Sequence, residues 1–480
     1  MYPRFKLNHL VLALMACSPG AALAETEVLA SPASDNVLQL DDTHVVATAA
    51  QELKQAPGAS IITAEDIKKR PPVNDLSDII RKMPGVNLSG NSASGTRGNN
   101  RQIDLRGMGP ENTLILIDGK PVTSRNAVRY TRSGERDTRG DSNWVPADEV
   151  ESIEVLRGPA AARYGSGSMG GVVNIITKRP TQELSGSLSA YTNLPEDDAE
   201  GMTKRTTFSL SGALTEALAF RVYGNLNKTD ADDSDINLAH TDTASGSALG
   251  AGREGVRNKD INALLSWALD DQQTLDFETG FSRQGNIYTG DVGTGGTDSQ
   301  TPGSTINQWL GRETNTMYRQ NFSVTHRGDW AFGTSRVLAQ YEKTRNNRLL
   351  EGQTGAVDGD ISTNADKSTS TYDSYLVQGE LNIPLQVLLP QTLTLGAEWN
   401  RQELDDPSTF DRAVGTTLPN SALGARSSYM DATIMALFME DNIELSPKWF
   451  LTPGLRLDHH DQFGANWSPS LNSSYMLTDD

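Results

Sequence analysis

From residue 184 onward the chain repeats short segments in which apolar and polar residues alternate. In Leu218–Asn227, four apolar side chains fall on one face of a strand, and an arginine, a tyrosine and two asparagines fall on the other. The same period recurs in Leu275–Ser282, Leu393–Asn400 and Leu451–Asp458. A period of two residues is typical of strands with one apolar and one polar face. We predict about twelve such strands between Leu184 and Leu477.

The connections between these strands alternate in length. Short connections lie at Ala213–Glu216, Ala268–Gln272, Arg327–Phe332 and Leu445–Lys448. Long connections lie at Asp230–Arg257, Gln284–Thr316, Asn347–Thr371 and Glu403–Ser428. A soluble two-layer sandwich also alternates, but short turns at one end and long loops at the other favour an antiparallel transmembrane β-barrel with a polar lumen.

The last predicted strand ends just before Thr478-Asp479-Asp480, which is not the aromatic terminus usual in outer-membrane barrels. A barrel that lacks strands has two edges whose backbone groups lipid cannot satisfy. We therefore expect the 480 residues to be the front part of a longer protein. On their own they should not insert into outer membranes as a heat-modifiable barrel.

Residues 51–179 mix short helices with short strands. Four β-type runs are flanked by Gly, Pro or Asn residues. They lie at Ile103–Arg106, Leu114–Asp118, Val150–Leu156 and Val172–Thr177. Earlier elements are a strand at Ser60–Thr63, a helix at Ala64–Lys69 capped by Thr63, and a helix at Val73–Lys82 with Asn74 near its start and Pro84-Gly85 as its stop. The pattern predicts a small mixed α/β domain from Gln51 to Arg179, in which the four runs form one compact sheet.

Residues 1–24 have the layout of a cleaved secretory signal, with a basic start, an apolar stretch at Leu10–Ala16 and small residues at Ala22–Ala24. A lipoprotein signal ending at Cys17 is the alternative, but Met15 fits it poorly. Cleavage after Ala24 removes the only cysteine, so the mature chain has no thiol. Residues 25–50 form a polar arm with one β-prone patch, which fits either an ordinary disordered terminus or a strand that pairs with a partner's sheet.

Composition and motifs argue against several function classes. The net charge of −19 disfavours a nucleic-acid binder, and no segment approaches the ~20 apolar residues of a membrane helix. Gly165–Gly170 spells G-x-G-x-x-G, but the strand Val172–Thr177 follows it where a dinucleotide site needs a helix. His459 and His460 are neighbours on a strand, so they face opposite ways and do not share a metal ion. No catalytic spacing stands out, and we expect no enzyme activity, no resident cofactor and no metal site.

Several stretches resemble the TonB-dependent outer-membrane receptors of Gram-negative bacteria. IDLRGMGPENTLILIDGKPV and IEVLRGPAAARYGSGSMGGVVNIITK resemble the plug motifs, and DDTHVVAT resembles the TonB box. SRNAVRYTRSGERDTRGDSNWVP, NKDIN, SRQGNIYTGD, YRQN and LTPGLRLDHH resemble the branch that takes up ferric enterobactin and other catecholate siderophores. The resemblance covers nearly everything after Asp41.

The resemblance implies a plug domain, residues 51–179, inside a barrel of about 22 strands, of which about twelve lie in residues 180–480. It implies import of a ferric siderophore through TonB and the inner-membrane proton-gradient machinery, with outer-membrane lipid, and also bacteriocins or phage, as further partners. It favours the partner-strand interpretation of the patch in the arm. The TonB box would consist of Asp42, Thr43, His44, Val45, Val46, Ala47 and Thr48.

A ferric tris-catecholate is a trianion with electron-rich rings, which guanidinium groups bind by charge, forked donors and stacking. The loop Ser124–Asp141 carries five arginines and three acids, with Trp144 just beyond. We predict ligand-binding residues in this loop and at the barrel rim. They are Arg125, Arg129, Tyr130 and Arg132 in the loop, and Arg283, Tyr288, Tyr318 and Arg319 at the rim.

Two interpretations stay open. The loop arginines could instead pair with acids of the barrel wall and only hold the plug, which is the role that the resemblance implies for Arg106 and Arg157, with barrel glutamates beyond Asp480. The ligand could be haem, cobalamin or a hydroxamate chelate. A passive porin or adhesin would explain the barrel but not the plug or the TonB box, and a barrel enzyme such as an outer-membrane lipase would need a nucleophile that the sequence does not offer.

Overall fold

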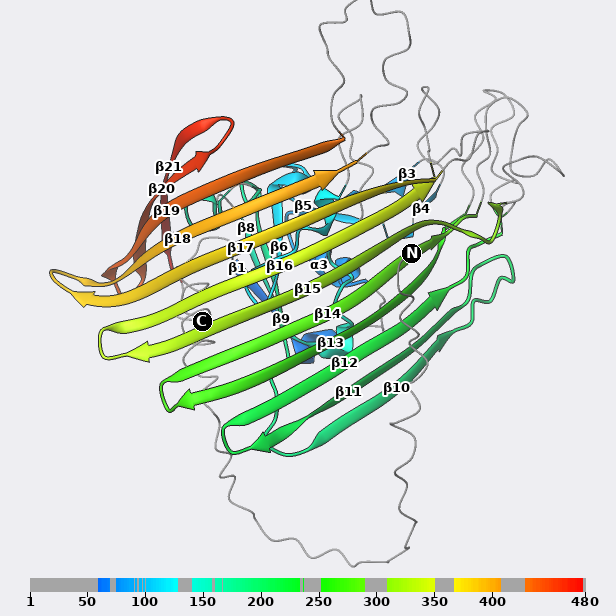
Figure 1. Cartoon of the computed structure of the whole chain (residues 1–480), viewed down its shortest axis with the longest axis horizontal. Helices are drawn as coiled ribbons and strands as arrows, with labels where there is room; N and C mark the ends of the chain where they lie inside the picture. The colour runs from blue at the N-terminus through cyan, green and yellow to red at the C-terminus, as the bar shows by residue number, and fades with distance from the viewer. Residues whose placement is uncertain are drawn as a thin grey trace, which may run out of the picture. The chain divides into compact units, whose positions relative to one another are not determined.

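The computed structural model consists, in its described part, of a small α/β domain followed by one large antiparallel sheet (Figure 1). It describes residues 59–69, 75–89, 91–92, 95–96, 98–99, 101–127, 140–157, 160–165, 167–233, 236, 252–289, 309–349, 367–406 and 428–477. All of these belong to one compact unit, Ala49–Asp480. The predicted signal peptide, the arm and residues 42–48 lie outside the described residues. No helix within the described ranges is long and apolar enough to cross a membrane.

The small domain is built on a five-stranded sheet in the order β1-β8-β9-β6-β7. The strands are β1 (Ala59–Thr63), β6 (Thr113–Ile117), β7 (Lys120–Pro121), β8 (Val150–Arg157) and β9 (Gly171–Thr177). β6 and β9 run parallel and the other neighbours antiparallel. Three of the four predicted β-type runs are therefore confirmed as members of one sheet, together with the predicted strand at Ser60–Thr63.

The prediction that Ile103–Arg106 belongs to the same sheet is wrong. This run is β5 (Gln102–Leu105), and it pairs with β2 (Val86–Ser89) in a separate two-stranded ladder. The chain turns away after β5 because Arg106 and Gly107 both have positive φ, and the Arg106 amide donates a hydrogen bond to the Gly85 carbonyl. A second short ladder joins β3 (Asn91–Ser92) and β4 (Gly95–Thr96).

The helices of the small domain are short. In α2 (Ala64–Lys68) the predicted cap is confirmed, because the Thr63 and Asp66 side chains bond to each other's backbone N–H groups in a capping box. The second helix is shorter than predicted: α3 spans only Ser77–Ile80, and the Asp75 carboxylate accepts a bond from the Ser77 amide at its start. The remaining helical turns are η2 (Pro110–Asn112), η3 (Ser124–Asn126), η4 (Ala147–Glu149) and α4 (Ala161–Tyr164).

The large sheet holds twelve strands, β10 to β21, each hydrogen-bonded to the next along the chain. The strands are β10 (Ser185–Asn193), β11 (Thr203–Thr215), β12 (Leu218–Thr229), β13 (Gly255–Asp270), β14 (Gln273–Ile287), β15 (Glu313–Trp330), β16 (Gly333–Leu349), β17 (Lys367–Gln386), β18 (Pro390–Asp405), β19 (Tyr429–Ser446), β20 (Trp449–His460) and β21 (Gly464–Tyr475). The predicted number of strands and the alternation of short and long connections are confirmed. In the described residues the sheet is open, with β10 and β21 at its edges.

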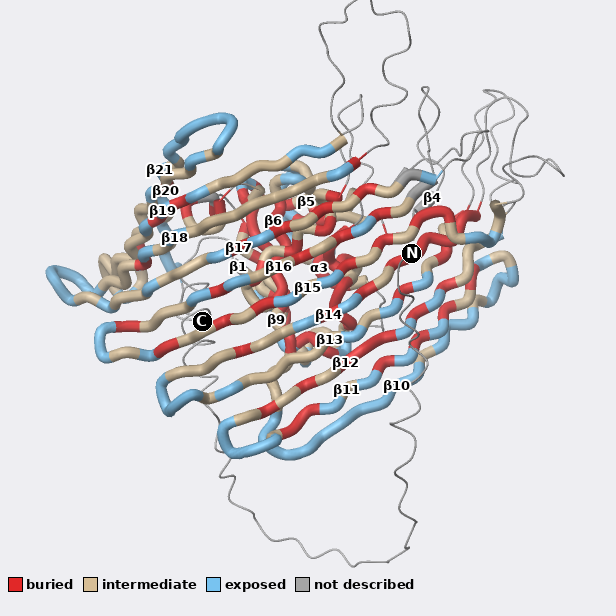
Figure 2. Tube along the Cα trace, viewed as in Figure 1, coloured by how far each residue is buried: buried red, intermediate tan, exposed pale blue. Residues whose placement is uncertain are grey.

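Each strand of the large sheet has an inner face toward the small domain and an outer face away from it. On β12 the inward Arg221 and Asn227 are buried, whereas the outward Leu226 is more than half exposed. Buried positions alternate with less buried ones along much of β11 and β12, whereas β10 is exposed along nearly its whole length (Figure 2). Large apolar side chains such as Phe281 and Leu437 are exposed on the outer face. This is the pattern of a barrel wall whose outer face contacts an apolar environment and whose inner face is polar.

The core of the small domain includes one side chain from the large sheet. Ile153, Val155, Val173 and Ile175 of β8 and β9 are fully buried, and Met317 of β15 packs in the same cluster, also fully buried. The large sheet therefore completes the core of the small domain by apolar packing as well as by polar contacts.

We expect Met317→Ala to lower the free energy of opening of the small domain by about 2–4 kcal/mol, because it leaves a cavity between the two parts. Hydrogen exchange of the β8 amides measures this opening. Met435→Ala is the matched control, since Met435 is more than half exposed on the outer face of β19. Equal effects of the two substitutions would contradict the packing role of Met317.

Candidate functional site

The two ends of the arginine-rich loop meet in a buried cluster of three side chains. Ser124, at the start of η3, donates to the Asp141 carboxylate, and the Trp144 indole N–H donates to both, at 3.0 Å to Ser124 Oγ and 3.2 Å to Asp141 Oδ1. Burial raises the pKa of the Asp141 carboxyl, while the charge of Arg125 and these hydrogen bonds oppose that rise. The cluster closes the base of the loop, and residues 128–139 between its ends lie outside the described part of the chain.

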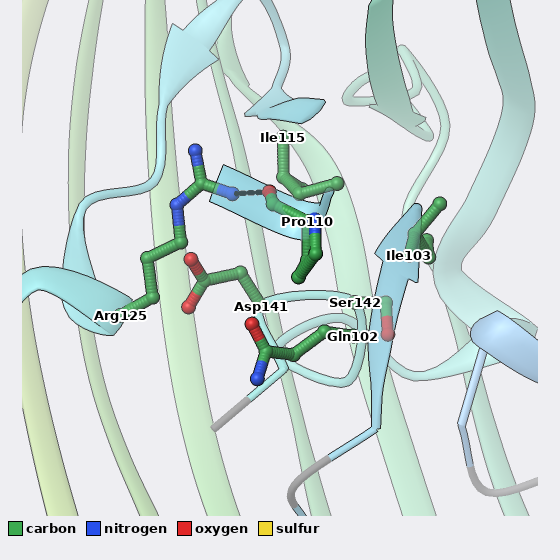
Figure 3. Close-up of a pocket in the computed structure, with 7 residues that line it drawn as sticks. All are labelled: Gln102, Ile103, Pro110, Ile115, Arg125, Asp141 and Ser142. Atoms are coloured by element: carbon green, nitrogen blue, oxygen red, sulfur yellow. Dashed lines mark hydrogen bonds between the residues drawn. The ribbon is translucent and has the colours of Figure 1, made fainter. Parts of the chain in front are cut away.

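Arg125, the first arginine of the loop, bonds to the small domain itself. One of its guanidinium nitrogens donates to the carbonyl oxygens of Pro110 and Thr113, both at 2.6 Å. Its side chain lines a small pocket together with Asp141 and Gln102 (Figure 3). Arg125 thereby fastens η3 to the start of β6. The other predicted loop residues, Arg129, Tyr130 and Arg132, lie outside the described residues, so their predicted role is untested.

The first end of the loop is attached to β15 and β16 through Glu342. The backbone N–H and hydroxyl of Thr123 both donate to Glu342 Oε1 at 3.0 Å. Arg319 donates to Glu342 Oε2 at 2.7 and 3.0 Å, and its guanidinium lies 5.7 Å from the centre of the Trp144 ring. Glu342 and Arg319 are both buried. This buried ion pair links the loop base directly to the wall.

The second end of the loop is attached to β13 and β14 through Asn99. The Gly140 amide donates to the Asn99 carbonyl at 2.9 Å. The Asn99 side chain accepts from Asn143 at 2.9 Å and from Asn258 at 2.7 Å, and it donates to Asn286 at 3.0 Å. Four strands of the wall, β13 to β16, therefore hold the base of one loop.

The structure divides the predicted rim residues between the two faces of the sheet. Arg319 faces inward to the loop base, whereas Arg283 and Tyr318 lie opposite each other on the outer face, with the Arg283 guanidinium 5.8 Å from the Tyr318 ring centre. Arg283 also donates two hydrogen bonds to Glu313, at 3.1 and 2.6 Å. Tyr288 is buried just beyond β14. The part predicted for these four residues in ligand binding remains a prediction. Arg319 reaches the loop base, whereas Arg283 and Tyr318 do not.

Arg106 and Arg157 lie close together beside Gly85. Arg157 is largely buried and donates to Ser60 Oγ at 2.9 Å, and burial together with the charge of Arg106 lowers the pKa of the Arg157 guanidinium. A carboxylate placed beside these two adjacent cations would be stabilising. The lock predicted for them is untested, because the glutamates proposed for it are placed beyond Asp480.

Comparison with known proteins places both parts of the chain in one family. A model described as the TonB-dependent receptor plug domain matches residues 52–172, and a TonB-dependent receptor-like β-barrel model matches residues 265–480. The chain belongs to the TonB-dependent receptors. It therefore lies in the outer membrane of a Gram-negative bacterium. The small domain is the plug, and the large sheet belongs to the wall of the barrel.

The chain is similar to receptors of Pseudomonas aeruginosa and Escherichia coli. The chain is 60% identical to the ferric enterobactin receptor PirA of Pseudomonas aeruginosa, over 99% of this chain and 65% of the relative. It is 52% identical to the ferrienterobactin receptor of Escherichia coli K12, over 93% of this chain and 61% of the relative. A mutant of the P. aeruginosa ferric enterobactin receptor, solved with enterobactin, has a TM-score of 0.79 and 61% identity, covering 89% of this chain and 61% of that one. The chain thus spans a little over three fifths of the length of these relatives.

The plug of this receptor has further charged contacts with the barrel wall that the sequence did not identify. The pairs are Glu149–Arg221, Lys120–Glu278, Arg163–Glu380 and Arg179–Asp276, with Arg327 as a second partner of Asp276. The two-residue period placed Arg221, Asp276 and Glu278 on the polar face of predicted strands, but nothing in that period names their partners in the plug. Glu342 and Asn99 were missed for the same reason. Glu380 was not identified, and Arg327, predicted to begin a short connection, lies within β15.

We expect Glu342→Gln to loosen the loop base, because it leaves the buried Arg319 guanidinium without a carboxylate. The free energy of local opening should fall by about 3 kcal/mol, measured by hydrogen exchange at the Thr123 amide. Glu313→Gln, which removes the partner of Arg283 on the outer face, should leave that amide unchanged. A comparable loss of protection in both variants would contradict the anchoring role of Glu342.

Proposed function

We propose that this receptor imports a ferric catecholate siderophore of the enterobactin type across the outer membrane, with energy supplied through TonB. The observation that carries the proposal is the loop between Ser124 and Asp141, which contains five arginines in its sequence and whose base is held by four barrel strands. The names of the relatives reported above support the same ligand class. A trianionic chelate gains most from several guanidinium groups because each supplies charge and paired donors.

The anchors suggest how binding is communicated to the plug. A ligand that moves either end of the loop changes the contacts of Thr123 with Glu342 or of Gly140 with Asn99, so the plug and the wall respond together. TonB acts on the arm before β1, with residues 42–48 as its contact. In the described residues β1 is an edge strand of the plug sheet and pairs with β8 alone. A force on the arm therefore reaches the plug sheet at its margin and rearranges it to open a path.

We also infer the domain borders: a signal peptide at 1–24, an arm at 25–50, the plug at 51–179 and the barrel wall from 180 onward. We also infer that the twelve strands are part of a barrel of about 22. The support is physical, because β10 and β21 each leave one edge without a neighbouring strand in the described residues, and hydrocarbon cannot satisfy such edges.

We expect saturable quenching of tryptophan fluorescence when the receptor is titrated with ferric enterobactin, and none with a ferric hydroxamate at equal concentrations. Arg129→Ala and Arg132→Ala should each weaken the binding of ferric enterobactin about tenfold, because each removes a charge-assisted contact. Arg81→Ala is the matched control, since Arg81 is an exposed plug arginine beside Asp78, and it should bind like the unaltered receptor. Saturation by the hydroxamate, or by neither chelate, would overturn the proposed ligand class.

A further inference from the structure

The outer face of the barrel wall carries a row of five cations near the end where the long connections lie. They belong to four consecutive strands, β11 to β14 (Figure 1). The residues of this cationic row are Lys204, Lys228, Arg257, Lys259 and Arg283. The first four are exposed and Arg283 is partly exposed. The strand register places all five on the face opposite to the plug, because their immediate neighbours, such as Asn258 and Ser282, are buried on the inner face.

The register brings like charges directly opposite one another. Lys228 lies between Lys204 of β11 and Arg257 of β13, and Lys259 lies opposite Arg283. Like charges at directly opposed positions of an antiparallel pair destabilise the sheet. An arrangement that repeats this conflict three times on neighbouring strands is best stabilised by an anion that contacts several of the cations at once.

Acidic side chains neutralise only part of the row. Asp230 pairs with Lys228, and Glu313 pairs with Arg283 at 2.6 Å and with Arg257 at 3.7 Å. Lys204 and Lys259 form no ion pair with any residue that the structure describes. The nearby connection between β10 and β11 contains the acids Glu196, Asp197, Asp198 and Glu200, and these form no ion pair with the row in the described ranges. Five cations and two paired acids leave an excess of three positive charges.

The row lies at the border of the apolar belt. Toward the opposite end of the strands, the next outward residues after Lys228, Lys259 and Arg283 are apolar. They are Leu226, Ile261 and Phe281, each two positions away in sequence, and all three are exposed. Two positions along a strand correspond to about 7 Å, so the cations lie at the edge of the exposed apolar side chains. At the opposite end of β13, Trp267 and Leu269 face outward, and no lysine or arginine faces outward at that end of β10–β16 within the described residues.

We propose that the cationic row binds the phosphate groups of a phosphorylated glycolipid in the outer leaflet. Long loops mark the extracellular end of outer-membrane barrels, so the row faces the outer leaflet. Four strands about 4.8 Å apart span about 14 Å, so a headgroup with more than one phosphate can contact both unpaired lysines. Its acyl chains then lie along the apolar side chains below the row. This inference concerns the outer face and does not depend on the proposed siderophore.

The test is a binding titration of the purified receptor in nonionic detergent with diphosphoryl lipid A, followed by native mass spectrometry. The double variant Lys204→Gln/Lys259→Gln should bind about 25-fold more weakly, or about fivefold for each lysine removed near a phosphate surface. Binding to the unaltered receptor should weaken as ionic strength rises, and dephosphorylated lipid A should bind no better than the double variant binds the phosphorylated form.

Lys343→Gln is the matched control. Lys343 lies on the outer face of β16 but donates two hydrogen bonds to Asp373, both at 3.0 Å, so its removal should change lipid binding little. The thermal unfolding midpoint of each variant establishes that the fold is intact. Equal binding of phosphorylated and dephosphorylated lipid, or unchanged binding by the double variant, would overturn the proposal.

Discussion

The polar inner face of the barrel wall has to find partners, because a buried polar group without one costs on the order of 1–3 kcal/mol. The plug supplies many of them. Asp276 is fully buried and is held between Arg179, which follows the plug sheet, and Arg327 of β15. Pairs of this kind add little net stability over apolar packing, but they are costly to break singly. They therefore fix where the plug sits more than how tightly it is held.

The interface between plug and wall consists largely of charged and amide groups, and this also determines what happens when the plug moves. Water can replace the partners of Glu342, Asn99 and Asp276, whereas it cannot replace apolar contacts without a large loss of free energy. In the hydrophobic core of the plug, Met317 is the one side chain that the described wall contributes. Water can therefore replace the contacts of this interface one strand at a time. Such an interface suits a domain that has to rearrange inside the barrel and then return.

The sequence predicted the elements whose periodicity is local. The alternation in residues such as Leu226 and Asn227 predicted both the strands and their faces, and Thr63 predicted the start of α2. Pairings over long distances were beyond it: β5 joined β2 because of the backbone turn at Arg106, and Glu342 met Thr123 across more than 200 residues. The arginine-rich loop was identified by its composition and by its resemblance to a family motif. Composition did not reveal that Arg125 bonds to the plug backbone, or that Tyr318 and Arg319, as neighbours on a strand, must serve different faces.

Met317 has a consequence for how the receptor is assembled. Because a residue of β15 occupies a place in the core of the plug, the plug cannot finish packing while it is still a separate N-terminal segment. In the periplasm it would keep a methionine-sized gap beside β8 and β9, and such a gap favours a loosely ordered chain. The plug is therefore a domain that matures only inside the barrel, so the order of synthesis, plug first, is the reverse of the order in which the two parts become fully folded.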